Sequence, residues 1–216
     1  MCFNKEVSIL TYIIGILSCY NLYKQDYKIE ALFFVWVVQM QFIEYIFWLN
    51  PICNKTNKLL TKIAIILNHT QPLILYILLI YYNGKLPDYV HKLVLIFTII
   101  NIFYTIYDIN KNDCSIVDNK ISSHIIWKWN SYEYHTLFYI LFIIISCILF
   151  YYIPNFNYNY HYSRNNILIF IYLISVIISY IIYRDKKSVG SMWCFAAALT
   201  PLILHFIYNY NKKLNY

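Results

Sequence analysis

Charge is what this sequence most lacks. Only 12% of its 216 residues are charged, 61% are hydrophobic, and the mean hydropathy is +0.51. Soluble domains carry about 25% charged residues, and a chain of this length cannot bury so much apolar surface in a water-soluble core. The composition therefore excludes an ordinary soluble domain and predicts a protein whose partner is the lipid bilayer.

Two further absences exclude other classes of protein. No run of four or more basic residues occurs, so neither a nucleic-acid partner nor a polybasic lipid-binding patch is expected. The six cysteines form no CxxC pair, which argues against a zinc knuckle and against a disulfide framework. We expect no cofactor and no bound metal.

Apolar runs of about 17–22 residues recur along the chain, separated by short charged loops, as transmembrane helices require. The runs are continuous and lack the alternation of a barrel strand, so helices are expected. We predict an all-α fold, a single domain over residues 1–216 that forms a bundle of seven transmembrane helices. Six is the alternative, because His91 and Lys92 fall in the first turn of the fourth span. The predicted spans are Val7–Tyr23, Ala31–Leu49, Ile63–Asn83, Val90–Tyr107, Tyr134–Ile153, Ile167–Tyr183 and Val189–Tyr210.

The distribution of basic residues predicts the orientation. Seven spans place ten of the 17 Lys and Arg residues on the side of the N-terminus, which favours a cytoplasmic N-terminus. Cys2, Cys53 and Cys114 lie on that side and are expected to be free thiols in a reducing compartment. The N-glycosylation acceptor pattern that begins at Asn54 also lies there, so no glycan is expected.

Glu44 is the only acidic residue well inside a predicted span, where an ionisable group is costly and often marks a functional site. Gln41 and Trp48 lie three residues before it and four after it, so the three side chains share one helix face.

The third span adds Asn68, His69 and Gln71 beside Pro72, whose ring leaves the Asn68 carbonyl without its helical donor. Glu44 and Asn68 each lie five residues from the loop between their spans. Antiparallel neighbours should therefore place them face to face.

The last span enters from the same side and brings Trp193 and Cys194 to the depth of Glu44. Small residues around them are also typical of simple helix packing, and polar side chains can serve only to join helices.

Three known classes fit poorly. An opsin needs a Schiff-base lysine in the last helix, and none occurs between Val189 and Asn211. A ceramidase-like zinc hydrolase needs several His and acidic residues at one depth. The sequence instead predicts His69 deep, His135 at the near interface and His205 towards the opposite face. A PQ-loop transporter should carry repeated Pro-Gln dipeptides, whereas this chain has one reversed pair at Gln71.

The motifs of three helices resemble a seven-helix membrane family of uncharacterised function that is encoded by giant DNA viruses and some microbial eukaryotes. These motifs are Met40-Gln41-Phe42-Ile43-Glu44 with Trp48, Asn68 with Gln71-Pro72, and Met192-Trp193-Cys194. The resemblance implies the seven-helix topology but no activity.

The leading hypothesis is a small transporter, channel or receptor-like protein whose polar pocket binds a small solute, an ion or a lipid headgroup. Glu44 would carry the charge, with Gln41, Asn68 and Gln71 as hydrogen-bonding neighbours. A second hypothesis is a lipid-modifying membrane enzyme that uses Glu44 and His69 as acid and base. A third is a structural membrane protein in which these residues only pack helices.

Overall fold

The computed structural model describes residues 4–82, 84–118, 124–127, 135–154, 161–182 and 189–213. A helix lies over each of the seven predicted ranges, and the third range is covered by two. In the described residues the elements are α1 (Lys5–Lys24), α2 (Lys28–Leu49), α3 (Lys55–His69), α4 (Gln71–Tyr81), α5 (Asp88–Lys111), β1 (Ile116–Asp118), β2 (His124–Ile126), α6 (His135–Tyr151), α7 (His161–Ile182) and α8 (Val189–Lys213).

The lengths and compositions of these helices are those of a helical membrane protein. Five of them, α1, α2, α5, α7 and α8, are long and apolar enough to cross a bilayer. The pair α3 and α4 reaches the same length and hydropathy together, with a bend of 50° at the break between them. The apolar helix α6 is shorter, at 17 residues.

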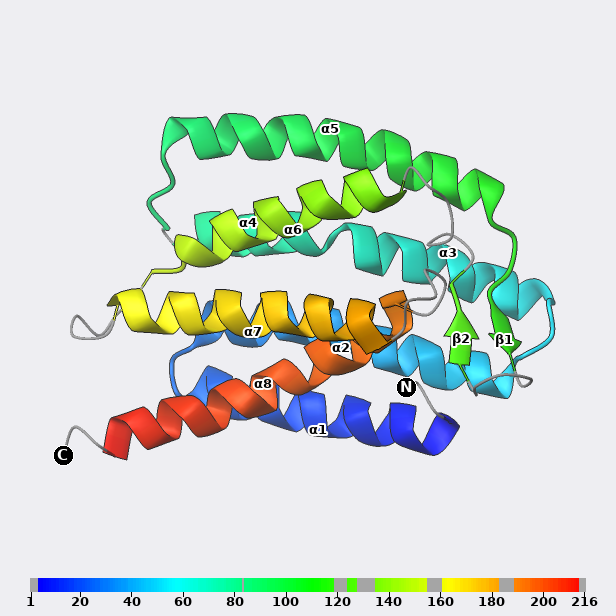
Figure 1. The fold of residues 1–216 in the computed structure, drawn as a ribbon, viewed down its shortest axis with the longest axis horizontal. Helices are drawn as coiled ribbons and strands as arrows, with labels where there is room; N and C mark the ends of the chain where they lie inside the picture. The colour runs from blue at the N-terminus through cyan, green and yellow to red at the C-terminus, as the bar shows by residue number, and fades with distance from the viewer. Residues whose placement is uncertain are drawn as a thin grey trace.

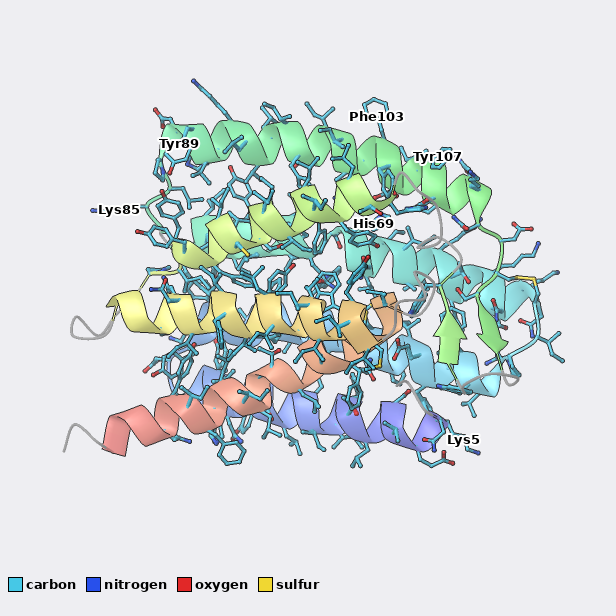
Figure 2. All side chains as sticks on the ribbon, viewed as in Figure 1. Lys5, His69, Lys85, Tyr89, Phe103 and Tyr107 are labelled. Carbon is cyan, nitrogen blue, oxygen red and sulfur yellow. A yellow bond between two sulfur atoms is a disulfide. The ribbon has the colours of Figure 1, made fainter. Side chains whose placement is uncertain are left out.

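The helices lie side by side along one direction, with α1 and α5 at opposite edges of the bundle (Figure 1). Helix α2 is central and packs against α1, α3, α4 and α8. Lys5 and Lys85 lie at opposite ends of the bundle (Figure 2). The outer helix faces are apolar, with Leu10, Leu95, Phe103 and Ile182 among the exposed side chains, so lipid must cover them.

One end of the bundle carries the start of α1, the start of α3 and the antiparallel pair β1–β2, and α8 ends at the other end (Figure 1). Trp127, directly after β2, is fully buried, with its ring 5.5 Å from that of Phe47 on α2. The segment between α5 and α6 therefore covers part of this end of the helix bundle.

The expectation of free thiols at this end is wrong for two of the three cysteines. Cys53, between α2 and α3, and Cys114, after α5, form a disulfide with a Cα–Cα distance of 5.6 Å. The two segments meet because the backbone N–H of Ser115 donates to Asn57 Oδ1 (3.1 Å) and Thr61 Oγ1 (2.9 Å) on α3. A separation of 61 residues gave no local signal of this pairing. Cys2 lies outside the described residues.

Candidate functional site

The candidate site is organised around the break between α3 and α4. Thr70 separates the two helices, and Pro72 stands in the first turn of α4. Two carbonyls beside the break accept hydrogen bonds from other helices: Trp36 Nε1 donates to Leu67 O (3.1 Å), and Asn101 Nδ2 donates to His69 O (3.0 Å). Irregular backbone at membrane depth is tolerated where neighbouring side chains satisfy its polar groups in this way.

The His69 side chain faces α5, where it meets two polar groups. Its Nδ1 lies 3.0 Å from Thr105 Oγ1, and its Nε2 lies 3.6 Å from Asp108 Oδ2. His135 on α6 brings its Nδ1 within 3.9 Å of the same Asp108 oxygen and hydrogen bonds with the Tyr104 hydroxyl. We call these five residues the Asp108 cluster.

The two imidazoles and the carboxyl group of the Asp108 cluster are buried, whereas Tyr104 and Thr105 are half-buried. The side chains of His69 and Asp108 are 0% exposed, and that of His135 is 4% exposed. Phe103 and Tyr107 point outward from α5, and His69 lies on its inner side (Figure 2). A carboxyl group and two imidazoles at such depth are costly unless they pair with one another, and their distances fit such pairing.

Among the described residues, no group of three or more His, Cys, Asp or Glu side chains is arranged to hold a metal ion. Imidazole and carboxyl groups at these distances can exchange a proton.

Glu44 lies in a second buried polar group on α2. Gln41 Nε2 donates to Glu44 Oε2 over 2.7 Å, and both side chains are fully buried. Cys194 of α8 is also buried and belongs to the same apolar cluster as Met40 and Phe47 of α2. Gln41 and Glu44, which were predicted to share one helix face, thus form a direct hydrogen bond with each other.

Tyr139 on α6 contacts residues beside both polar groups. Its hydroxyl donates to Asn68 Oδ1 (3.0 Å), and its ring centroid lies 6.3 Å from that of His69. Its ring also packs edge to face with that of Trp193, at 6.4 Å between centroids. Tyr139 therefore contacts both His69 of the Asp108 cluster and Trp193, the neighbour of Cys194 in the chain.

The remaining predicted residues occupy less polar surroundings. Gln71, at the start of α4, is 5% exposed. Trp48 is half-buried and packs against the apolar group that includes Met40, Phe47 and Trp127. The predicted partners Glu44 and Asn68 take their described hydrogen bonds from Gln41 and Tyr139.

Sequence reasoning missed Asp108 and His135. The predicted fourth span ended at Tyr107, one residue short, whereas α5 continues to Lys111. His135 was not expected to meet His69, and it is buried beside His69 and Asp108. The sequence did contain a pattern that could have indicated Asp108. A polar face of one helix is expected from the 3–4 spacing of Asn101, Tyr104, Thr105 and Asp108.

A separate buried ion pair lies elsewhere in the bundle. Glu30, in the first turn of α2, pairs with Arg164 on α7, and both side chains are largely buried. The Arg164 guanidinium also lies 4.8 Å from the Tyr27 ring and 5.7 Å from the Tyr208 ring. The predicted second span began at Ala31, one residue after Glu30, whereas α2 begins at Lys28.

Comparison of the chain with family models, with curated proteins and with solved structures finds no match. The resemblance to the seven-helix family stays a prediction, and the functional argument rests on the geometry of the polar core.

Proposed function

We propose that this protein is a small membrane transport protein whose Asp108 cluster takes up and releases a proton during the transport of a small solute or ion. The observation that carries the proposal is the approach of two buried imidazoles, His69 and His135, to one carboxyl oxygen at 3.6 and 3.9 Å. Chains of acidic and histidine side chains inside a membrane are typical of proton relays in pumps and transporters.

The proposed topology has seven crossings: α1, α2, the bent α3–α4 pair, α5, α6, α7 and α8. Helix α6 spans about 25 Å at 1.5 Å per residue, close to the thickness of the hydrocarbon core. The break in the third crossing supports a transport role, because discontinuous helices commonly bind substrates or coupling ions near the middle of transporters.

In this proposal the buried polar residues have separate roles. Asp108 and the two histidines hold the proton. The hydrogen-bonded pair Tyr139 and Asn68 lies beside them on α6 and α3. Glu44, held by Gln41, is the second charged site and binds the solute or ion. Since these side chains are buried, binding requires a second conformation in which the helices around the break open to one side.

The test is proton movement in liposomes that contain the purified protein and a trapped pH-sensitive dye. A pH gradient is imposed, and Na⁺, K⁺, amino acids and sugars are supplied in turn. The proposal predicts a proton flux above that of empty liposomes, increased by at least one of these solutes and lost in Asp108→Asn.

The matched control is Asp113→Asn, the same chemical change at a carboxylate that is 76% exposed and pairs with Lys58 outside the helix core. It should keep the flux. A flux that survives Asp108→Asn, or no flux in any of these conditions, contradicts the proposal.

Two contacts of the His69 ring support a second candidate function, that of a lipid-modifying hydrolase. Thr105 Oγ1 and Asp108 Oδ2 flank opposite ring nitrogens of His69, at 3.0 and 3.6 Å. A hydroxyl, an imidazole and a carboxylate in this order are the parts of a nucleophile activated by a base and its orienting group. This assignment replaces Glu44 with Asp108 as the partner of His69.

The two candidates are separated by Thr105. Hydrolysis of lipids in the liposomes, followed by mass spectrometry, should disappear in Thr105→Val and persist in Thr105→Ser if the hydroxyl is the nucleophile. The transport proposal predicts no hydrolysis products in any of the three proteins.

A further inference from the structure

We infer that the end of the bundle that carries the Cys53–Cys114 disulfide faces an oxidising compartment outside the cytosol, and that Asn54 at this end is an N-glycosylation site. The inference reverses the orientation predicted from basic residues, and it does not depend on the transport proposal. It follows from the disulfide and the exposed acceptor pattern lying together in one short connection between α2 and α3.

The disulfide determines the compartment. Disulfides form and persist in oxidising environments such as the endoplasmic reticulum and the cell surface, and they are rare in the cytosol, where thiols are kept reduced. This one joins two connections that are already held together by Asn57, Thr61 and Ser115 and by the Lys58–Asp113 ion pair at 2.9 Å. The thiols are thus brought into bonding position by the folded chain at this end.

The distribution of basic residues, which favours the opposite orientation, is weaker evidence than the disulfide. Ten basic residues on one side and seven on the other differ by only three. The positive-inside rule describes a bias in loop composition, whereas a disulfide between two loops requires that both of them meet an oxidising environment.

Asn54 has the geometry that a glycan needs. The acceptor triplet Asn54-Lys55-Thr56 is exposed at all three residues. Asn54 is the N-cap of α3, and its Oδ1 accepts from the backbone N–H of Asn57 at 2.9 Å. A glycan is attached through the side-chain nitrogen, so a modified Asn54 keeps the oxygen that caps the helix.

The site also clears the bilayer. Lys55, Lys58 and Lys62 are exposed along the first two turns of α3, which places these turns outside the hydrocarbon core. Asn54 lies eight residues before Lys62, about 12 Å further out at 1.5 Å per residue. A transferase at the membrane surface can therefore reach it.

The chain contains an internal control. Asn68-His69-Thr70 is a second acceptor triplet, but Asn68 is 3% exposed and sits at the helix break inside the polar core. The inference predicts that Asn54 is modified and Asn68 is not.

The experiment expresses the full chain in a eukaryotic cell and compares its gel mobility before and after treatment with an N-glycosidase. The wild-type band should shift by one glycan. Asn54→Asp, which keeps an oxygen for the α3 cap, and Thr56→Ala should both lose the shift. Thr56→Ser preserves the acceptor pattern and should keep it, and Asn68→Asp should change nothing.

A second arm separates the acceptor site from the orientation. The same chain carries an added acceptor sequence after Tyr216, at the end opposite to the disulfide. This added site should remain unmodified. A wild-type chain that shows no glycan at Asn54 overturns the assignment of Asn54, and a glycan at the added C-terminal site overturns the orientation as well.

Discussion

The carboxyl groups of Glu30, Glu44 and Asp108 are all buried in the helix bundle, and each is held differently. Glu30 has a cationic partner, Glu44 accepts from an amide, and Asp108 lies between two imidazoles. A buried carboxylate with a permanent cation is fixed in charge, whereas an imidazole can exchange a proton with a neighbouring carboxyl group. Of these three carboxyl groups, Asp108 is therefore the one that we propose moves a proton.

The amide neighbour of Glu44 gives a stability prediction. Glu44→Gln keeps the size of the side chain and an acceptor oxygen for Gln41, so its thermal stability in detergent should stay close to that of the wild type. Glu44→Leu leaves the buried Gln41 amide without this acceptor and should lower the free energy of unfolding by about 1–3 kcal/mol. Equal stability of the two variants would contradict the hydrogen bond.

The buried ion pair of Glu30 and Arg164 leads to a prediction about stability: losing one member should cost more than losing both. Removing one member in Arg164→Met leaves a buried carboxylate without its cation and should cost about 3–5 kcal/mol. The double variant Glu30→Leu, Arg164→Met removes both charges and should recover much of that loss, as measured by thermal unfolding. A double variant that is less stable than Arg164→Met would show that the pair is not the source of the effect.

Apolar runs were sufficient to place a helix over each predicted span, because lipid imposes both length and hydrophobicity on a spanning helix. They failed at helix ends. Asp108 lies one residue beyond its predicted span, since a polar residue at the end of an apolar run reads as the start of a loop. Its inward direction depends on packing against α3 and α6, which a hydropathy pattern does not contain.

The sequence predicted the local features of the candidate site but not the contacts between distant segments. The sequence indicated the buried Glu44 with Gln41 and the disturbed helix at Pro72, because each is a local departure from an apolar run. It could not pair His69 with Asp108 and His135, which lie 39 and 66 residues further along the chain. The disulfide was missed for the same reason, since contacts between distant segments leave no mark in either segment alone.

Gly15 provides a prediction about helix packing. A Cβ atom built on it would lie 2.8 Å from Val38 Cγ2 on α2 and 3.1 Å from the Ala198 carbonyl on α8. Gly15→Ala should therefore destabilise the protein by about 1–3 kcal/mol through overpacking.

Adding Val38→Ala to Gly15→Ala relieves the side-chain contact and should restore part of the lost stability, measured as the unfolding temperature in detergent. Leu17→Ala, at a side chain that is 58% exposed on the same helix, is the control and should have little effect. If Gly15→Ala were as stable as the wild type, the close approach of α1 to α2 and α8 would be wrong.

At the scale of the whole molecule, the Cys53–Cys114 bond links the connection before α3 to the segment after α5 across 61 residues. Closing a long loop in the unfolded chain raises stability by about 2–4 kcal/mol. Cys53→Ser should lower the unfolding temperature accordingly, and a reducing agent should lower that of the wild type but not of the variant.

Cys147→Ser serves as the control, because Cys147 is a free, half-buried thiol on α6. It should leave the effect of the reducing agent unchanged. A wild-type protein whose unfolding temperature does not respond to reduction would contradict the disulfide.

In the proposed function, His69 and Asp108 act as one proton-carrying unit within the bundle. The most direct measurement is the proton flux of liposomes that contain the wild type, His69→Gln, Asp108→Asn or the double variant. Residues that act as a unit are not additive: once one is lost, losing the second costs little more. We predict that each single variant loses most of the flux and that the double variant loses no more than either. Two losses that multiply in the double variant, or single variants that keep the wild-type flux, would contradict the account.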